Sequence, residues 1–273
     1  MVEATASDRA SDEILLGELH NGVLRLTLND HQRRNALSEA MLARLSEALA
    51  SAAADDSVRV IIIAARGPAF CAGHDLKEIS AARSADDAGQ ADFKRLFDSC
   101  AAVMQSIVDN PKIVIAEVAG VATAAGCQLV ASCDLALAAD SARFATPGVN
   151  IGLFCSTPMV ALSRNIAPKH AMQMLLTGDM ISAAKAEQIG LINGVVETAL
   201  LTEQSTALAG KIASKSNMTV ALGKQAFYRQ AQMPLANAYE YTSEVMVDNL
   251  LKHDAKEGIG AFIDKRAAHW RDQ

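Results

Sequence analysis

The chain has 273 residues, enough for one large domain or two modest ones, and 51% of them are hydrophobic, which supplies a substantial core. A net charge of −6 without any local run of lysine and arginine argues against a general nucleic-acid binder. No apolar run reaches the roughly 18 residues that a membrane span needs, so a membrane protein is not expected either.

The cysteines and the first residues indicate that the protein works in a reducing compartment. Five cysteines, an odd number with no C-x-x-C pair, disfavour a disulfide framework and a zinc site and are typical of a reducing compartment. The opening segment MVEATASDRASD is polar and contains acidic residues, so it fits neither a signal peptide nor a transit peptide. We therefore predict a disordered start over residues 1–13, no metal, and a cytoplasmic protein.

The first expected elements are a hairpin, a helix and a buried strand. Residues 14–28 contain two apolar runs joined by Asn21-Gly22, the strongest short signal for a two-residue turn. A helix is expected from about Ser38, a good N-cap that precedes apolar residues at helical spacing. Residues 58–64 form a continuous apolar run, which predicts a strand buried on both faces. A loop rich in turn residues then leads into a helix at about Leu76.

The middle of the chain alternates helices with strands. A polar stretch over 80–90 predicts a mobile loop, and the following helix is expected over 93–108, because Asn110-Pro111 ends it. Further along we expect strands at 113–115, 135–138 and 143–145, a helix over 127–132, and helices that start near Thr157-Pro158 and Ala167-Pro168.

The segment at 117–134, EVAGVATAAGCQLVASCD, is the one around which the chain is organised. Its strand breaks at Gly120, and a run of small residues up to Gly126 leads into a helix. Unpaired N–H groups at a helix start favour negative charge, and small residues let a ligand approach the backbone. The pattern indicates an oxyanion or phosphate cradle or, equally, a tight turn with close packing. It lacks the G-x-G-x-x-G spacing of a dinucleotide site.

The C-terminal part of the chain changes character. From about Thr202 onward we find no strand pattern, only three or so amphipathic helices. The predicted organisation is therefore an α/β core over residues 14–200 and a helical region over residues 201–273.

Two separated loops, AFCAGHDL at 69–76 and GVATAAGCQLVASCD at 120–134, each follow a strand and precede a helix. The pair resembles the crotonase (enoyl-CoA hydratase/isomerase) superfamily. The match extends over nearly the whole chain past residue 13, because four more motifs occur in the same order: RRNALS at 33–38, FATPGVNIGL at 144–153, LLTGDMISAAKAEQIGLINGVV at 175–196 and GIGAFIDKR at 258–266. GHDLKE and ATAAGCQLVASCD resemble in particular the enoyl-CoA hydratase domain-containing proteins.

The resemblance implies an α/β fold, a crotonase-like spiral of ββα units with a helical C-terminal trimerisation region, in a homotrimer or a dimer of trimers. It also implies an acyl-CoA thioester as ligand, with coenzyme A as part of the substrate and no separate cofactor, and a place in fatty acid metabolism. The thioester oxygen would lie between the backbone N–H groups of His74 and Ala125, and such donors are worth roughly 100- to 1000-fold in rate.

The resemblance further implies which residues line the coenzyme A and acyl sites. Lys265 is expected to reach a phosphate across a subunit interface. The other expected residues are Arg33, Arg34, Ala36, Ala72, Gly73, Asp75, Leu76, Gly126, Pro147 and Leu153.

The chain departs from the family at the two residues that move protons in hydration. The family has a glutamate at each of two positions that hold Gln128 and Gly148 here. A glutamine can hold a water molecule through its amide but is not a base near neutral pH, and glycine contributes nothing. We therefore expect ordinary hydratase activity to be weak, while the oxyanion loops are intact.

Several alternatives stay open. The His74 side chain either carries the proton or hydrogen-bonds away from the site, and Cys155 is more typically a small hydrophobic residue than a nucleophile. Arg33 and Arg34 are either phosphate ligands or a solvated charge pair. The protein could be an acyl-CoA enzyme with another proton carrier, or a non-catalytic acyl-CoA-binding or regulatory protein. Because some decarboxylating relatives have a histidine at the position of His74, loss of CO₂ from a malonyl-type thioester is a third reading.

Overall fold

Strands β1 (Leu15–His20) and β2 (Val23–Leu28) begin the fold in the computed structural model, which describes residues 13–273. They pair antiparallel around Asn21 and Gly22, which have φ of 49° and 78°, as a type I′ hairpin turn requires. The predicted hairpin is confirmed. Of the disordered start predicted for residues 1–13, residues 1–12 lie outside the described part of the chain.

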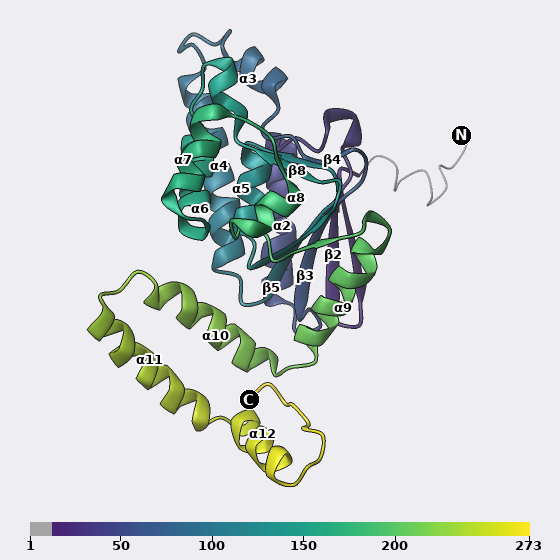
Figure 1. Cartoon of the computed structure of the whole chain (residues 1–273), viewed down its shortest axis with the longest axis vertical. Coiled ribbons are helices and arrows are strands. Elements are labelled where there is room, and N and C mark those ends of the chain that lie inside the picture. The colour runs from purple at the N-terminus through teal and green to yellow at the C-terminus, as the bar shows by residue number, and fades with distance from the viewer. Residues whose placement is uncertain (1–12) are drawn as a thin grey trace.

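Two sheets form the body of the molecule (Figure 1). The larger has the order β1-β2-β3-β5-β7-β10 and the smaller the order β4-β6-β8-β9. The remaining strands are β3 (Val60–Ala65), β4 (Ala69–Cys71), β5 (Ile113–Val118), β6 (Val121–Thr123), β7 (Leu135–Ala139), β8 (Arg143–Ala145), β9 (Ile181–Ser182) and β10 (Gly194–Val196). From β3 to β8 consecutive strands alternate between the sheets, and a helix follows each pair. This is the predicted spiral of ββα units, so the fold class is confirmed.

Helices cover the sheets and fill the space between them. The predicted cap at Ser38 is confirmed, because its side chain accepts a hydrogen bond from the Met41 N–H. The Asp75 side chain caps α3 in the same way, by accepting a hydrogen bond from the Lys77 N–H. Every residue of α5 is buried, so this helix lies inside the body. The helices of the body are η1 (His31–Arg33), α2 (Glu39–Ala54), α3 (Leu76–Ala82), α4 (Gln90–Val108), α5 (Ala125–Ser132), η2 (Pro147–Ile151), α6 (Ser156–Asn165), α7 (Pro168–Thr177), α8 (Ala183–Gln188), η3 (Thr198–Leu200) and α9 (Leu201–Ala213).

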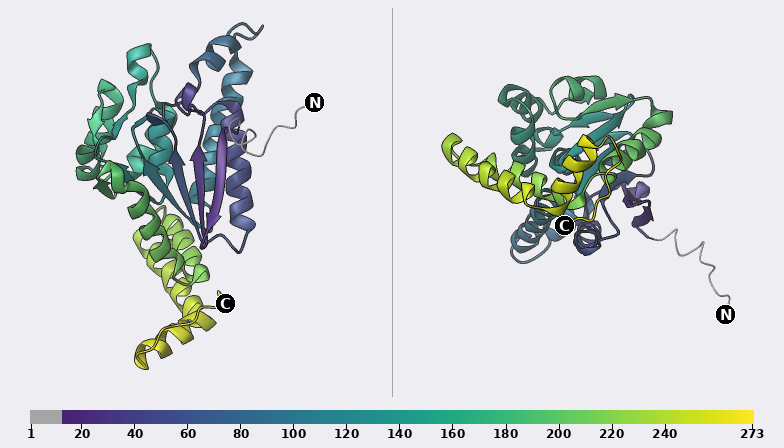
Figure 2. Two further views of the ribbon diagram at one scale, coloured as in Figure 1. Left: turned by 90° about the vertical axis from the view of Figure 1, so that its right-hand side faces the viewer. Right: turned by 90° about the horizontal axis from the view of Figure 1, so that it is seen from below.

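Three helices, α10 (Asn217–Gln230), α11 (Leu235–Leu250) and α12 (His253–Ile263), project from the body at the end away from α3 (Figures 1 and 2). No strand follows β10 within residues 13–273, as predicted. With α9 there are four C-terminal helices where about three were expected.

A buried ion pair joins α10 to the body. The Lys224 Nζ donates to Asp134 Oδ2 at 2.7 Å and to the backbone carbonyls of Ile107 and Lys112. The Tyr228 hydroxyl donates to the other oxygen of Asp134. The Lys224 and Asp134 side chains are only 3% and 9% exposed, so the network that orients α10 is almost entirely shielded from water.

The structure differs from the sequence prediction mainly around the central motif. Residues 121–123 form β6, where only a turn was expected, and α5 begins at Ala125, two residues early. The turn that makes this possible is Gly120, whose φ is 83° and where a Cβ would lie 2.3 Å from the Pro68 carbonyl oxygen. Only glycine therefore lets the chain pass from one sheet to the other at this point.

The predicted loop over 80–90 is shorter than expected. Helix α3 continues to Ala82, and α4 begins at Gln90 instead of residue 93. The Asp87 side chain accepts hydrogen bonds from the N–H groups of Gly89 and Ala91, which stabilises the early start of α4. The connecting segment is thus limited to residues 83–89.

Candidate active site

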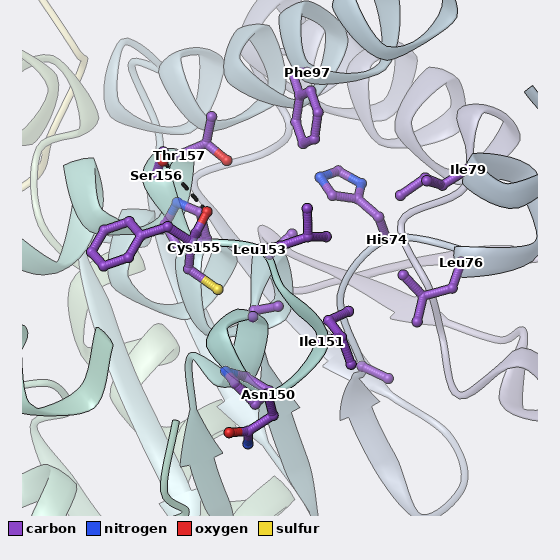
Figure 3. Close-up of a pocket in the computed structure, with 17 residues that line it drawn as sticks. His74, Leu76, Ile79, Phe97, Asn150, Ile151, Leu153, Cys155, Ser156 and Thr157 are labelled. Carbon is purple, nitrogen blue, oxygen red and sulfur yellow. Dashed lines mark hydrogen bonds between the residues drawn. The ribbon is translucent and has the colours of Figure 1, made fainter. Parts of the chain in front are cut away.

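A cavity of about 530 Å³ opens between the loop after β4, helices α3 and α4, and residues 147–158 (Figure 3). This is a common size for a small-molecule site. The wall is mostly apolar and includes Leu76, Ile79, Phe97, Ile151, Leu153 and Phe154. Four polar side chains line it, those of His74, Asn150, Ser156 and Thr157, and none of the lining residues is a carboxylate, a lysine or an arginine.

The two loops that the sequence singled out meet at this wall. Gly73 has φ of 98°, and a Cβ at this position would lie 2.9 Å from the Ala124 Cβ and 3.5 Å from the Ala125 backbone nitrogen. The loops lie side by side because residue 73 has no side chain. His74 and Ala125 both line the cavity as a result.

Ala124 is held in a strained conformation directly before α5. Its φ of 50° and ψ of −119° are rare for a residue with a Cβ and cost about 1–3 kcal/mol. Two hydrogen bonds hold it there, from its N–H to the Ala145 carbonyl and from the Gln128 N–H to its own carbonyl. The unusual ψ sets the direction of the next N–H group, that of Ala125.

Two backbone donors at the cavity have no partner. Within residues 13–273, neither the His74 N–H nor the Ala125 N–H has a hydrogen-bond acceptor. Buried backbone N–H groups are almost always paired, and Ala125 is only 1% exposed, so its unpaired N–H beside a second free donor requires an explanation. Donors arranged in this way stabilise an oxygen on which negative charge develops.

The His74 side chain is fixed by one hydrogen bond. Its Nδ1 lies 3.1 Å from the Leu37 carbonyl oxygen, and its ring stands edge-on to Phe97 with the centroids 5.4 Å apart. Because a carbonyl oxygen only accepts, Nδ1 carries the proton and Nε2 has none in the neutral ring. Nε2 is buried and has no partner in the described part of the chain. Burial lowers the pKa of His74 from its ordinary 6.5, and the bond to Leu37 offsets only part of this effect.

The two positions without carboxylates have different surroundings. Gln128 lies on α5, 4% exposed, outside the wall of the cavity, and its Oε1 has no hydrogen-bond partner among residues 13–273. Gly148 lies in the wall, where a Cβ would be 2.6 Å from the Leu153 carbonyl oxygen and 2.9 Å from the Cys155 Sγ. Neighbouring atoms therefore occupy the space that a side chain at residue 148 would need.

Cys155 fits the reading as a small hydrophobic residue. Its thiol is buried, and burial raises its pKa above the ordinary 9.0. A thiol that does not ionise is a poor nucleophile.

The loop predicted to line the coenzyme A channel pairs with the loop after β4. The Ala72 N–H donates to the Arg34 carbonyl, and the Leu37 N–H donates to the Gly73 carbonyl. Arg33 is exposed and lies 3.7 Å from the Asp75 carboxylate, whereas Ala36 is buried. The structure thus brings residues 33–36 and 72–75 together, and Ala72 and His74 of the second segment line the cavity.

The remaining predicted residues divide into three groups. Leu76, Pro147 and Leu153 line the cavity. Gly126 does not; a Cβ there would lie 2.1 Å from the Cys71 carbonyl oxygen, so its lack of a side chain lets α5 pack on β4. Lys265 follows α12, at the opposite end of the molecule from α3 (Figure 1), and within one chain it does not reach the cavity.

Two kinds of residue at the site were not among those expected from the sequence. Asn35 is fully buried and has φ of 52°. Its side-chain oxygen accepts a hydrogen bond from the Asp30 N–H, and its amide nitrogen donates to the Arg66 and Ala69 carbonyls. These bonds hold the segment around Asn35 against the residues that lead into β4. Asparagine tolerates a positive φ and bonds to nearby backbone groups, so an asparagine in this polar loop was the available signal for such a turn. The apolar residues Ile79, Phe97 and Phe154 gave no signal, because only the fold brings them together.

Within residues 13–273, no group of three or more histidine, cysteine, aspartate or glutamate side chains is placed to hold a metal ion. No helix there combines the length and the apolar character needed to cross a bilayer.

Comparison with known proteins finds strong similarity along nearly the whole chain. A family model described as enoyl-CoA hydratase/isomerase matches residues 18–273. Enoyl-CoA hydratase domain-containing protein 3, mitochondrial, of Rattus norvegicus is 49% identical over 250 residues, which cover 92% of this chain and 82% of that protein. The crystal structure of an enoyl-CoA hydratase from Mycobacterium smegmatis is 48% identical with a TM-score of 0.91 and covers 95% of this chain and 99% of that one. For human enoyl-CoA hydratase domain-containing protein 3 the identity is 46%, the TM-score 0.90 and the coverage 94% and 100%.

Proposed function

Because the chain belongs to the enoyl-CoA hydratase/isomerase family, we propose that it binds acyl-CoA thioesters with the thioester oxygen between the N–H groups of His74 and Ala125. The observation that carries the proposal is the pair of unpartnered donors at one cavity. The strained backbone of Ala124 supports it, because such strain is typical of functional sites. The similarity to the enoyl-CoA hydratase domain-containing proteins confirms the predicted subgroup.

The wall of the cavity favours an uncharged acyl group. No cationic side chain lines it to pair with a second carboxylate, and a buried unpaired charge is costly. We therefore favour acyl-CoA thioesters of fatty acid metabolism over malonyl-type thioesters. Coenzyme A enters as part of the substrate, and no resident cofactor is needed.

Ordinary hydration is proposed to be slow. It requires two carboxylates around one water molecule, and Gln128 and Gly148 supply neither. Of the reactions in this family, we therefore expect the lyase reaction of a hydratase to be the slowest in this protein. A non-catalytic acyl-CoA-binding or regulatory role is the second candidate, which the loss of both carboxylates favours.

The assembly and the compartment are also proposals. Exposed apolar side chains on α10, α11 and α12 support a homotrimer or a dimer of trimers, in which Lys265 of one copy approaches the site of another. Five unpaired cysteines within the described residues support a reducing compartment such as the cytoplasm. The Rattus norvegicus and Homo sapiens relatives are named mitochondrial.

Calorimetry with a non-hydrolysable acyl-CoA analogue tests the binding proposal. Ala125 is the first residue of α5, where proline is tolerated because the N–H has no partner inside the helix. Ala125→Pro removes this one donor and places a ring carbon where the oxygen would bind. Since the residue before a proline is restricted, the change is made together with Ala124→Gly and compared with Ala124→Gly alone.

We expect saturable binding by the wild-type protein and at least a tenfold weaker affinity in the double variant than in the single one. Circular dichroism checks that both variants are folded. Equal affinities in the two variants would place the thioester elsewhere, and a wild-type protein that binds no analogue would overturn the proposed function.

A further inference from the structure

The imidazole of His74 is a cavity group that the proposed function leaves unused, since that function needs only its backbone N–H. We propose that Nε2 of His74 is the base that removes a proton from the α-carbon of the bound acyl-CoA, while the N–H groups of His74 and Ala125 hold the thioester oxygen. The inference rests on the proposed function and adds the group that moves the proton.

The hydrogen bond to Leu37 prepares the ring for this role. Nδ1 donates to the Leu37 carbonyl at 3.1 Å, which keeps the ring in the form whose Nε2 has a free lone pair. Nε2 has no partner among residues 13–273, although a buried ring nitrogen normally has one. A lone pair held in a fixed direction without a partner is available to a substrate.

No other side chain in the wall of the cavity can act as the base. The titratable side chains of the wall are those of His74 and Cys155, because no lining residue is a carboxylate or an amine. Burial raises the pKa of the Cys155 thiol, so it stays protonated at neutral pH. His74 is the wall residue that is neutral and basic at pH 7.

The His74 imidazole lies where an acyl chain bound in the cavity can reach it. Figure 3 shows the imidazole extending from the loop before α3 into the cavity, between Phe97 and Leu153. The Phe97 ring stands edge-on to the imidazole, and the Phe97 and Leu153 side chains are 39% and 46% exposed. Because exposed side chains move at low cost, an acyl chain that enters the cavity can displace them and contact Nε2.

The reaction is balanced without another reactant. The α C–H bond breaks, its proton forms a bond to Nε2, and the electron pair moves onto the thioester oxygen, where two N–H groups stabilise the enolate. The imidazolium then returns the proton to the α-carbon. With a β,γ-unsaturated acyl chain it can instead deliver the proton to the γ-carbon, which yields the conjugated thioester.

Deuterium uptake measures this step directly. A saturated acyl-CoA such as butyryl-CoA is incubated with the protein in D₂O, and exchange at the α-carbon is followed by proton NMR. His74→Asn keeps a donor at the place of Nδ1, and His74→Gln keeps an amide near the place of Nε2, but neither is a base. His20→Asn, at the exposed end of β1, serves as the matched control.

We expect the wild type and His20→Asn to exchange the α-proton at the same rate, and both His74 variants to lose roughly 100-fold or more. Binding of the acyl-CoA analogue should change by less than threefold in either variant, because the backbone N–H remains. Exchange at the wild-type rate in a folded His74 variant would overturn the assignment. So would binding by the wild type without exchange above the protein-free rate, whereas absent binding would overturn the proposed function itself.

Discussion

Ala124 shows how a single residue carries the geometry of the site. With φ of 50° and ψ of −119°, its backbone occupies a region that glycine adopts without strain. Ala124→Gly relieves about 1–3 kcal/mol of strain but makes the unfolded chain more flexible, at a cost of about 0.4–1 kcal/mol. We therefore expect a net gain in the free energy of unfolding of up to about 2.6 kcal/mol, measured by urea denaturation. A loss of stability would show that Ala124 is not strained.

His74 leads to a prediction about pH. Its pKa in the folded protein is lowered below 6.5 by burial, and the groups packed against the ring, the Leu37 carbonyl and Phe97, carry no charge. The neighbouring Asp75 carboxylate is engaged as the cap of α3. Because the base acts when unprotonated, α-proton exchange should be constant near pH 7 and decline only at pH values below 6.5.

The same pKa shift affects stability. Above pH 6.5 the histidine is neutral in both the folded and the unfolded state and contributes no pH dependence. As the pH falls below 6.5, the unfolded state binds the proton more readily, so the folded state loses stability. Urea denaturation at several pH values should show a larger loss in the wild type than in His74→Asn, and the difference is the contribution of His74.

The two missing carboxylates lead to a prediction about hydration. Each such group supplies roughly 100- to 10,000-fold, so wild-type hydration of a short enoyl-CoA should be several orders of magnitude slower than that of an ordinary hydratase. Gln128→Glu together with Gly148→Glu should raise the rate more than either change alone, because the two groups act as a unit.

The Gly148→Glu change is also expected to destabilise the protein. A side chain at residue 148 meets the Leu153 carbonyl and the Cys155 Sγ, so Gly148→Glu should lower the free energy of unfolding by about 1–3 kcal/mol. Loss of absorbance of a conjugated enoyl-CoA measures the rate in folded samples. A wild type that turns over at an ordinary enzyme's rate would contradict the reading of Gln128 and Gly148.

At the scale of elements, the docking of α10 depends on one buried ion pair. Burial raises the pKa of Asp134 and lowers that of Lys224, and the charge of each partner opposes the shift in the other. Lys224→Met leaves the Asp134 carboxylate buried without its cation, so we expect a loss of about 3–5 kcal/mol in the free energy of unfolding. Tyr228→Phe, which removes one hydrogen bond from the same carboxylate, should cost less.

Chemical denaturation of both variants, followed by circular dichroism, measures the two costs. Equal and small losses would mean that the apolar contacts of α10, not the ion pair, position the C-terminal helices.

At the scale of the whole molecule, the C-terminal helices predict self-association. Leu235, Leu251, Phe262 and Ile263 are exposed on or beside α11 and α12, which project from the body (Figure 2). Apolar surface of this extent is typical of an interface. We expect light scattering to give the mass of three or six chains, and Phe262→Asp to lower it.

Leu19→Asp is the control, because Leu19 is an exposed apolar residue of β1 on the body. A wild type that is monomeric at every concentration in a dilution series would contradict the prediction.

Local patterns in the sequence determined most of the elements of this protein. The hairpin at Asn21-Gly22, the cap at Ser38 and the buried strand β3 follow from interactions within a few residues, and the structure confirms them. The family and the fold class were also accessible, because several motifs occur in a fixed order along the chain. The strand β6 was not, because three small residues carry no periodic pattern and become a strand only beside β4 and β8.

The site depended on contacts between distant segments. The sequence suggested that His74 and Ala125 act together, but only the packing of Gly73 against Ala124 brings their loops into contact. The Leu37 carbonyl, 37 residues away along the chain, selects which nitrogen of His74 is free, and the atoms of Leu153 and Cys155 fill the space beside Gly148. Hydrogen-bond partners and filled volumes are properties of neighbours in space, so the tertiary structure alone decided which side chain is available for chemistry.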